Sequence, residues 1–283
     1  MPAPVLSVLN MKGGVGKTTV SAHVMRVLYH HMRKRVLLID LDAQFNLTQS
    51  VMTQNTYDNL DETKTVKSCF EPLPSNDFFQ VRRSDNPPPK ASEISVRLRR
   101  VGSGETARLD LLPGSFELMK YSMIDDSGQL NYASRYLKRF LSLARSEYDL
   151  IVLDCNPSTS FVTKCALENS THILSPVKPD KFSILGVGMV DKLFAHLGLS
   201  LDHMILVNGV KRTDAMTSVE EDLRAHSNFG PKVLLNRLVQ SKHLAADPSY
   251  TGFATDKGGP YSSVLRREIA GIAREISNHL GIG

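Results

Sequence analysis

The chain has 283 residues, of which 41% are hydrophobic and 22% charged, a composition that suits a folded globular domain and excludes disorder and collagen-like repeats. It has no apolar run near the roughly 20 residues of a membrane-crossing helix, no secretion signal at its start and no even set of cysteines, so we expect a cytoplasmic protein. The net charge of +5 permits contact with nucleic acid or anionic lipid without requiring either.

Apolar runs typical of buried strands alternate along the chain with segments of helical spacing. Strands are predicted over residues 5–10, 36–40, 109–112, 150–154, 172–177, 204–210 and 233–238. Helices are predicted over residues 19–32, 131–146, 161–168, 184–197, 219–226 and 262–280. Strands that are apolar on both faces belong to a parallel sheet covered by helices. We therefore predict one α/β domain over residues 1–283, with a doubly wound, mostly parallel sheet, helices on both faces and ligands bound where strands end in loops.

A glycine-rich loop follows the first predicted strand and opens the first helix. Its residues are Lys12, Gly13, Gly14, Val15, Gly16, Lys17, Thr18 and Thr19. The glycines allow backbone N–H groups to surround phosphate oxygens, and the helix N-terminus adds partial positive charge. The sequence therefore predicts a P-loop, in which Lys17 bridges the β- and γ-phosphates of ATP and Thr18 supplies a hydroxyl to Mg²⁺. The second lysine, Lys12, is not required by such a phosphate cradle.

Carboxylates end two of the predicted strands. Asp40 and Asp42 stand two residues apart where the strand over residues 36–40 opens onto the ligand crevice, so both are predicted to lie near Mg²⁺ and the γ-phosphate. The strand over residues 150–154 ends in Asp154, whose carboxylate can hold magnesium-linked water without disturbing the phosphates.

Residues 53–108 show no clear period and contain the triple proline 87–89, which predicts an extended loop across that point. The part over residues 82–108 carries seven basic and three acidic residues, so it supplies most of the net charge. We interpret the segment as a Pro/Arg-rich insertion, which is either a solvated loop or a contact for DNA or another partner.

The run KGGVGKTT resembles the signature of the deviant Walker A family, the ParA/MinD class of P-loop ATPases. The stretch from Asp40 to Thr48 is similar to the family's DLDPQGNAT, with Ala43 in place of proline and Phe45 in place of glycine. The stretch that begins at Asp154 is similar to D-x-P-P, with Asn156 in place of the first proline. Only residues 53–108 are unmatched.

The resemblance implies roles for individual residues. Lys12 reaches across an ATP-sandwich homodimer to the nucleotide of the other subunit, Asp42 positions or activates the attacking water, and Asp40 holds Mg²⁺ through water. Asn208, which ends the strand over residues 204–210, contacts adenine. The predicted catalytic residues are Lys12, Lys17 and Asp42, and the predicted metal ligands are Thr18, Asp40 and Asp154. The residues from Lys12 to Thr19, together with Asn208, form the predicted ATP site.

The resemblance also implies partners and a location. These are a second copy of the chain, non-specific DNA, and a ParB-like adaptor that stimulates slow ATP hydrolysis at the nucleoid while a plasmid, chromosome or other large cargo is positioned. The predicted DNA contacts are Lys211, Arg212, Arg237 and Lys242. Each of these side chains is also typical of a solvated surface charge.

Other members of the class offer alternative functions. A MinD-like membrane-associated positioning ATPase shares the nucleotide motifs but ends in a basic helix that lies on lipid. The helix over residues 262–280 has an apolar stripe and mixed charges, so we expect it to pack in the core and expect no stable membrane association. Iron–sulfur relatives bridge a cluster with cysteines, whereas Cys155 has no second cysteine at a matching spacing. An inactive nucleotide-dependent scaffold is a further alternative.

Overall fold

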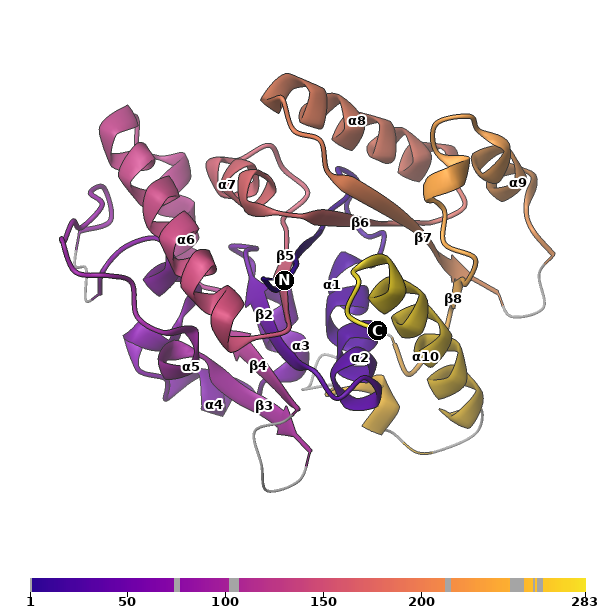
Figure 1. The fold of residues 1–283 in the computed structure, drawn as a ribbon, viewed down its shortest axis with the longest axis horizontal. Helices are drawn as coiled ribbons and strands as arrows, with labels where there is room; N and C mark the ends of the chain where they lie inside the picture. The colour runs from indigo at the N-terminus through magenta and orange to yellow at the C-terminus, as the bar shows by residue number, and fades with distance from the viewer. Residues whose placement is uncertain are drawn as a thin grey trace.

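A computed structural model of the chain describes residues 2–73, 77–101, 107–211, 215–244, 252–256, 258 and 262–283. Its strands are β1 (Val5–Val8), β2 (Arg35–Asp40), β3 (Val96–Arg100), β4 (Arg108–Leu112), β5 (Leu150–Asp154), β6 (His172–Val177), β7 (Asp202–Val210) and β8 (Leu238–Val239). They form one sheet in the order β3-β4-β2-β5-β1-β6-β7-β8, in which only the edge strand β3 is antiparallel to its neighbour (Figure 1). The predicted mostly parallel α/β fold is confirmed.

Helices cover both faces of this sheet. They are α1 (Lys17–Thr19), η1 (Val20–Val24), α2 (Met25–His31), α3 (Asn46–Val51), α4 (Gln54–Asp58), η2 (Glu62–Lys64), η3 (Val66–Cys69), α5 (Ala91–Ile94), η4 (Phe116–Ser122), α6 (Ser127–Glu147), α7 (Phe161–Asn169), α8 (Lys181–Leu197), α9 (Ser218–Ala225), η5 (Gly230–Lys232), η6 (Ala254–Asp256) and α10 (Ser262–His279). The elements α1, η1 and α2 follow one another without a break, with a π-helical turn at η1. Within the described residues, no helix is long and apolar enough to cross a membrane.

Two hydrophobic cores lie on opposite faces of the sheet. One contains α2 and α10 packed side by side, with α2 against β2 and β4 and α10 against β8, and the other contains α6 and α7 (Figure 1). The apolar stripe of α10 is buried in the first core, where Ile269, Ile272 and Ile276 have no exposed surface. The expectation that this helix packs in the core is therefore confirmed.

Side-chain caps set where the helices begin. α6 starts four residues before the predicted position because Asp126 accepts hydrogen bonds from the backbone N–H groups of Gly128 and Gln129. α8 starts at Lys181 rather than residue 184, because the side chain of Asp180 caps the N–H of Ser183. In both helices a single polar residue sets the start, and such a residue does not show in the apolar periodicity from which the helices were predicted.

The predicted strand over residues 233–238 is wrong. Only one isolated bridge, between Val233 and Ile205, joins this segment to the sheet before the two-residue strand β8. The backbone N–H groups of Leu235 and Asn236 instead donate to the carboxylate of Glu275 on α10. A helix side chain thus takes the hydrogen bonds that a strand would have made with the sheet.

The predicted loop over residues 53–108 is largely structured. It forms α4, η2, η3 and α5 and then adds β3 antiparallel to the edge of the sheet, whereas the triple proline 87–89 lies in neither a helix nor a strand. Arg99 on β3 pairs with Asp256, which also pairs with Arg26 on α2. The insertion is therefore attached both to the sheet and to the C-terminal part of the chain.

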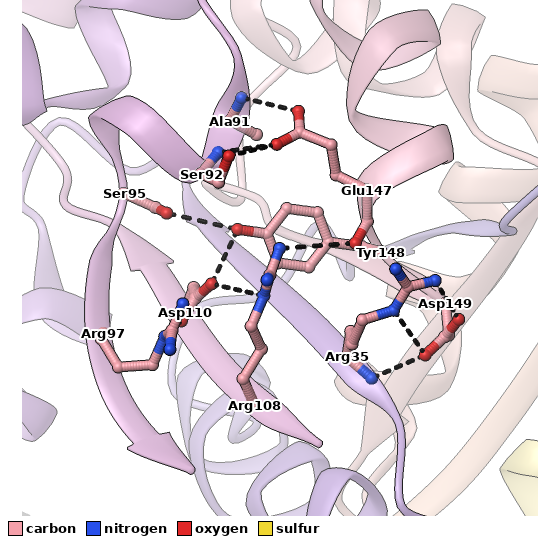
Figure 2. Close-up of polar contacts among 10 residues, drawn as sticks. All are labelled: Arg35, Ala91, Ser92, Ser95, Arg97, Arg108, Asp110, Glu147, Tyr148 and Asp149. Atoms are coloured by element: carbon pink, nitrogen blue, oxygen red, sulfur yellow. Dashed lines mark hydrogen bonds and ion pairs between the residues drawn. The ribbon is translucent and has the colours of Figure 1, made fainter. Parts of the chain in front are cut away.

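A buried carboxylate anchors β3 and β4 to the end of α6 (Figure 2). Asp110 is 1% exposed and pairs with Arg97 and with Arg108, whose Nε lies 3.1 Å from Oδ2, while the Tyr148 hydroxyl donates to Oδ2 at 2.8 Å. Burial and the neighbouring Asp110 charge raise the pKa of Tyr148 well above its usual value. Beside them, Glu147 accepts hydrogen bonds from the start of α5, which fixes the insertion to α6.

Removing the Asp110 carboxylate should destabilise the fold strongly. Asp110→Ala removes the carboxylate that pairs with the 6%-exposed Arg108, so the charge of this buried guanidinium is less well compensated, which we expect to lower the free energy of unfolding by about 3–5 kcal/mol. The matched control is Asp149→Ala, which removes a carboxylate from the half-buried pair with Arg35 and should cost about 1 kcal/mol. Urea unfolding followed by circular dichroism measures both, and equal losses would contradict this account.

Candidate functional site

The predicted P-loop connects β1 to α1 and is braced from outside. Gly14 and Gly16 have φ values of 71° and 95°, which glycine adopts without strain. The Asn208 amide donates to the backbone carbonyl of Val15 at 2.7 Å, and a Cβ atom on Gly16 would lie 2.1 Å from the Asn208 nitrogen. The Asn208 side chain is therefore hydrogen-bonded to the backbone of the P-loop. Its predicted contact with adenine stays a prediction.

Asn10 braces the other end of the loop. Its amide donates to the carbonyls of Pro176 and Ser183 at 2.9 and 3.4 Å, and its Oδ1 accepts the backbone N–H of Lys12 at 2.9 Å. A buried amide that is satisfied on both sides holds its neighbours in one geometry. The loop is thus fixed relative to β6 and α8.

A cavity of about 830 Å³ opens at the carboxyl ends of the strands. Its P-loop wall consists of Gly13, Gly14, Gly16, Lys17, Thr18 and Thr19. Its other walls include Asp42, Gln44, Phe45, Asn46 and Thr48 after β2, Asn156 and Pro157 after β5, and His23 and Leu244. This volume lies within the range of small-molecule sites. Most of the predicted P-loop residues and Asp42 are therefore brought together around one cavity.

Lys17 presents a buried ammonium to this cavity. Its Nζ lies 3.4 Å from the carbonyl of Asn10 and 3.3 Å from that of Lys12. Burial lowers the pKa of Lys17, and the charges of Asp154 and Asp42 act in the opposite direction. An ammonium held by carbonyls at the N-terminus of a helix is suited to bind the phosphates of a nucleotide.

Oxygen atoms that could hold Mg²⁺ lie on Thr18, the residue after Lys17, and on Asp154. The Thr18 hydroxyl donates to Asp154 Oδ2 at 3.0 Å and the Ser21 hydroxyl donates to Oδ1 at 2.8 Å. No group of three or more His, Cys, Asp or Glu residues suited to a metal occurs among the residues that the structure describes. This donor set fits Mg²⁺, which takes one or two protein oxygens and completes its shell with water and substrate phosphates.

Asp40 and Asp42 differ in their surroundings, although they are two residues apart. Asp40 is fully buried, and its Oδ2 accepts the backbone N–H and the hydroxyl of Thr48 at 2.9 and 2.7 Å. Burial, together with the nearby Asp154 charge, raises the pKa of Asp40. Asp40 does not line the cavity, and its bonds to Thr48 hold α3 in place. Its predicted contact with Mg²⁺ through water stays a prediction.

Asp42 lines the cavity and is bound by three hydrogen-bond donors. The backbone N–H of Gln44 and the amide of Asn156 both donate to Oδ1 at 3.0 Å, and the amide of Asn46 lies 3.3 Å from Oδ2. Of these donors, Asn156 comes from the loop after β5. The carboxylate can therefore accept a further hydrogen bond, from water, mainly at Oδ2.

The loop after β2 keeps its tight turn without the expected glycine. Phe45 has φ 42° in the left-handed region, a conformation that is unfavourable for a side chain with a Cβ atom. Its ring stacks on Tyr57 with the centroids 5.4 Å apart, and the Tyr57 hydroxyl donates to the Gly114 carbonyl at 3.0 Å. Tyr57 lies in the insertion and was not predicted to form part of the site.

Lys12 lies outside the cavity lining. Its Nζ donates to Asp180 Oδ1 at 2.7 Å and to the Ser183 hydroxyl at 3.3 Å, and it lies 5.6 Å from the centroid of the Phe182 ring. Burial acts to raise the pKa of the Asp180 carboxyl, but hydrogen bonds from Lys12 and Ser183 lower this pKa below its usual value. The ammonium is about one-third exposed, at the first turn of α8.

His23 is a second cavity residue that the sequence did not indicate. It lies on the π-helical turn after the P-loop, and its Nδ1 accepts the backbone N–H of Ala254 at 3.1 Å. Nothing in the sequence pattern distinguishes this histidine from an ordinary core residue. It joins the P-loop helix to the C-terminal segment.

Three of the predicted DNA contacts, Lys211, Arg237 and Lys242, are not among the residues that line the cavity. Lys211 and Lys242 are exposed, whereas Arg237 pairs at 3.2 Å with Glu220, which is buried and also pairs with Arg224. Arg212 lies outside the described residues. Lys211 and Lys242 are therefore available to a solvent-side partner, and Arg237 has a structural role.

Known proteins resemble this chain in sequence and in fold. Residues 3–204 match the family described as AAA domain. A ParA family protein of Chlamydia muridarum is 28% identical over 72% of this chain and 69% of its own length, and the sporulation initiation inhibitor protein Soj of Bacillus subtilis is 26% identical over 87% and 88%. A putative plasmid partition protein of Borrelia burgdorferi bound to AMPPNP has a TM-score of 0.71 at 19% identity and covers 98% of this chain and 99% of its own.

Variants of Lys17 and Asp42 should separate nucleotide binding from chemistry. Lys17→Ala removes the cation at the phosphate loop and should abolish measurable binding of a fluorescent ATP analogue. Asp42→Ala should keep the affinity within about twofold and lower the rate of phosphate release by about 100-fold, as expected for a group that acts on the attacking water. Equal hydrolysis by Asp42→Ala and the wild type would contradict the role of Asp42.

Proposed function

This chain belongs to the AAA domain family as a ParA-family ATPase, and from that premise we propose that it is a Mg²⁺-dependent partition ATPase working as an ATP-sandwich dimer on DNA. The observation that carries the proposal is the pair of lysines on one loop. Lys17 points into the cavity, whereas Lys12 lies outside it at the same edge of the sheet. These positions support a division of roles, in which Lys17 serves the nucleotide of its own chain and Lys12 serves that of a second subunit.

The residues around the cavity divide the work of ATP hydrolysis. The P-loop amides and Lys17 hold the phosphates, and Thr18 and Asp154 hold Mg²⁺, which neutralises phosphate charge. Asp42 accepts a hydrogen bond from the attacking water and orients it. Because phosphoryl transfer depends on positioning and charge stabilisation, these groups account for slow hydrolysis without a covalent intermediate.

Dimerisation follows from electrostatics at the cavity mouth. Two ATP-bound subunits that face each other would bring phosphate charges together, which opposes association. A Lys12 ammonium from each subunit on the other's phosphates counters that repulsion. In the present structure Lys12 pairs with Asp180 of its own chain, so it exchanges this partner for the nucleotide when the dimer forms.

Lys12→Ala should lose the ATP-dependent dimer while retaining ATP binding. We expect light scattering with a non-hydrolysable ATP analogue to report a dimer for the wild type and a monomer for the variant. Lys181→Ala is the matched control, since it removes an exposed lysine from the same end of α8 and should still dimerise. A dimer that persists unchanged in Lys12→Ala would reject the action of Lys12 in trans.

DNA binding is the activity that ATP binding and hydrolysis control in this proposal. Solved structures similar in fold include one titled pNOB8 ParA bound to nonspecific DNA, at 21% identity and a TM-score of 0.61. We propose that Lys211 and Lys242 contact the phosphate backbone of DNA. Arg212 remains a predicted DNA contact. A dimer presents each of them twice, so the number of phosphate contacts doubles when ATP is bound. A ParB-like adaptor would then stimulate hydrolysis and release DNA at the nucleoid.

DNA binding should require ATP, ignore sequence and weaken steeply with salt. Each phosphate contact should contribute about 0.9 to the fall of log K per unit of log salt concentration. The double variant Lys211→Glu with Lys242→Glu should lose binding in gel shifts but keep the ATP-dependent dimer. Lys138→Glu with Arg139→Glu makes the same charge change on exposed positions of α6 and should bind normally. Equal binding with ATP, with ADP and without nucleotide would reject ATP-gated DNA binding.

The membrane-associated alternative lacks a surface for lipid at the expected place. An interfacial helix must offer its apolar stripe to the bilayer, and that of α10 is already buried between α2 and the sheet. The iron–sulfur alternative needs cysteines that can reach a cluster shared with a second subunit, whereas Cys69, Cys155 and Cys165 are all buried. Neither is the function that we propose.

A further inference from the structure

The hydrogen bond between Asn156 and Asp42 joins two loops that would otherwise meet only at their strands. β2 and β5 are neighbours, with Asp40 and Asp154 in register, so the loops that follow them start side by side. Asn156 Nδ2 donates to Asp42 Oδ1 at 3.0 Å across 114 positions of sequence. Both residues line the cavity that contains Lys17 and Thr18.

Asn156 is itself held in place. Its backbone carbonyl accepts the N–H of Ser158 at 2.8 Å, which closes a tight turn. The following Pro157 restricts the backbone of Asn156 to extended conformations. The amide therefore approaches Asp42 from a fixed direction, whereas the other two donors to Asp42 lie within four residues of it in the same segment after β2, Gln44 in the loop and Asn46 at the start of α3.

We propose that Asn156 is a positioning residue for ATP hydrolysis, whose amide holds Oδ1 of Asp42 so that Oδ2 faces the attacking water. The inference rests on the proposed ATPase function. Oδ1 accepts two hydrogen bonds at 3.0 Å, from Asn156 and Gln44, while Oδ2 accepts one at 3.3 Å. Without Asn156 the carboxylate can rotate and exchange its oxygens, so fewer encounters with water have the productive geometry.

Two variants of Asn156 separate the hydrogen bond from the stiffness of the loop. Asn156→Ala removes the donor and loosens the loop, whereas Asn156→Pro removes the donor and stiffens the loop. Both should lower kcat about tenfold and leave KM and the affinity for a fluorescent non-hydrolysable ATP analogue within about twofold, the effect expected for one hydrogen bond to a charged group. Ser158→Ala is the control in the same loop, since the backbone bond to Asn156 remains and kcat should not change.

A double-mutant cycle tests whether Asn156 acts through Asp42. In the Asp42→Ala background, Asn156→Ala should have no further effect on single-turnover phosphate release, because the group that it positions is absent. A readout independent of activity is the side-chain amide signal of Asn156 in ¹⁵N–¹H spectra. It is assigned by its absence from Asn156→Ala and should shift in Asp42→Ala.

The outcomes distinguish this inference from the proposed function. Wild-type protein that releases no phosphate from Mg·ATP would overturn both. Hydrolysis by the wild type that is matched by Asn156→Ala and Asn156→Pro would overturn only the role of Asn156. The same holds for an equal loss of ATP affinity and kcat, or for a further tenfold loss in the Asp42→Ala background.

Discussion

Burial of two carboxylates beside each other is the constraint on which the site depends. The parallel register of β2 and β5 places Asp40 opposite Asp154, and neither has contact with solvent. Buried carboxylates are tolerated only when hydrogen bonds or cations compensate them. Thr48 compensates Asp40, and Thr18, Ser21 and the charge of Lys17 compensate Asp154. The start of α3 and the start of the P-loop helix are therefore both fixed by the same pair of acids.

This arrangement makes the cavity sensitive to what binds in it. One hydroxyl and two ammonium groups that now bond to carboxylates or to backbone carbonyls are the groups that Mg²⁺ and phosphate would engage in the proposed function. Thr18 bonds to Asp154, Lys17 bonds to loop carbonyls, and Lys12 bonds to Asp180. Under the proposed function, nucleotide binding would replace these internal hydrogen bonds with external ones at three places. Coupling between the cavity and the surfaces around it follows from that exchange.

The sequence predicted the sheet and the phosphate loop because both depend on local patterns. Apolar strands of four to nine residues and the run from Lys12 to Thr19 carry their own signals, and the structure assembles most of that run around one cavity. The contacts of Tyr57, His23 and Asn156 could not be predicted, because each depends on a partner more than 10 positions away in the chain. β3 was missed for another reason. Its five residues include three arginines, and its apolar positions alone do not indicate a strand.

The two edges of the sheet limit how copies of this protein can associate. β3, at one edge, carries arginines at three of five positions and is bent by a bulge, and β8, at the other, has only two residues. Charged, short and irregular edge strands cannot accept a strand from a neighbouring molecule, which prevents both continuous sheets and aggregation through them. In the proposed dimer, the second subunit would therefore approach through side chains and loops rather than through backbone pairing. Such contacts can be made and broken within one catalytic cycle, whereas an intermolecular sheet would be difficult to reverse.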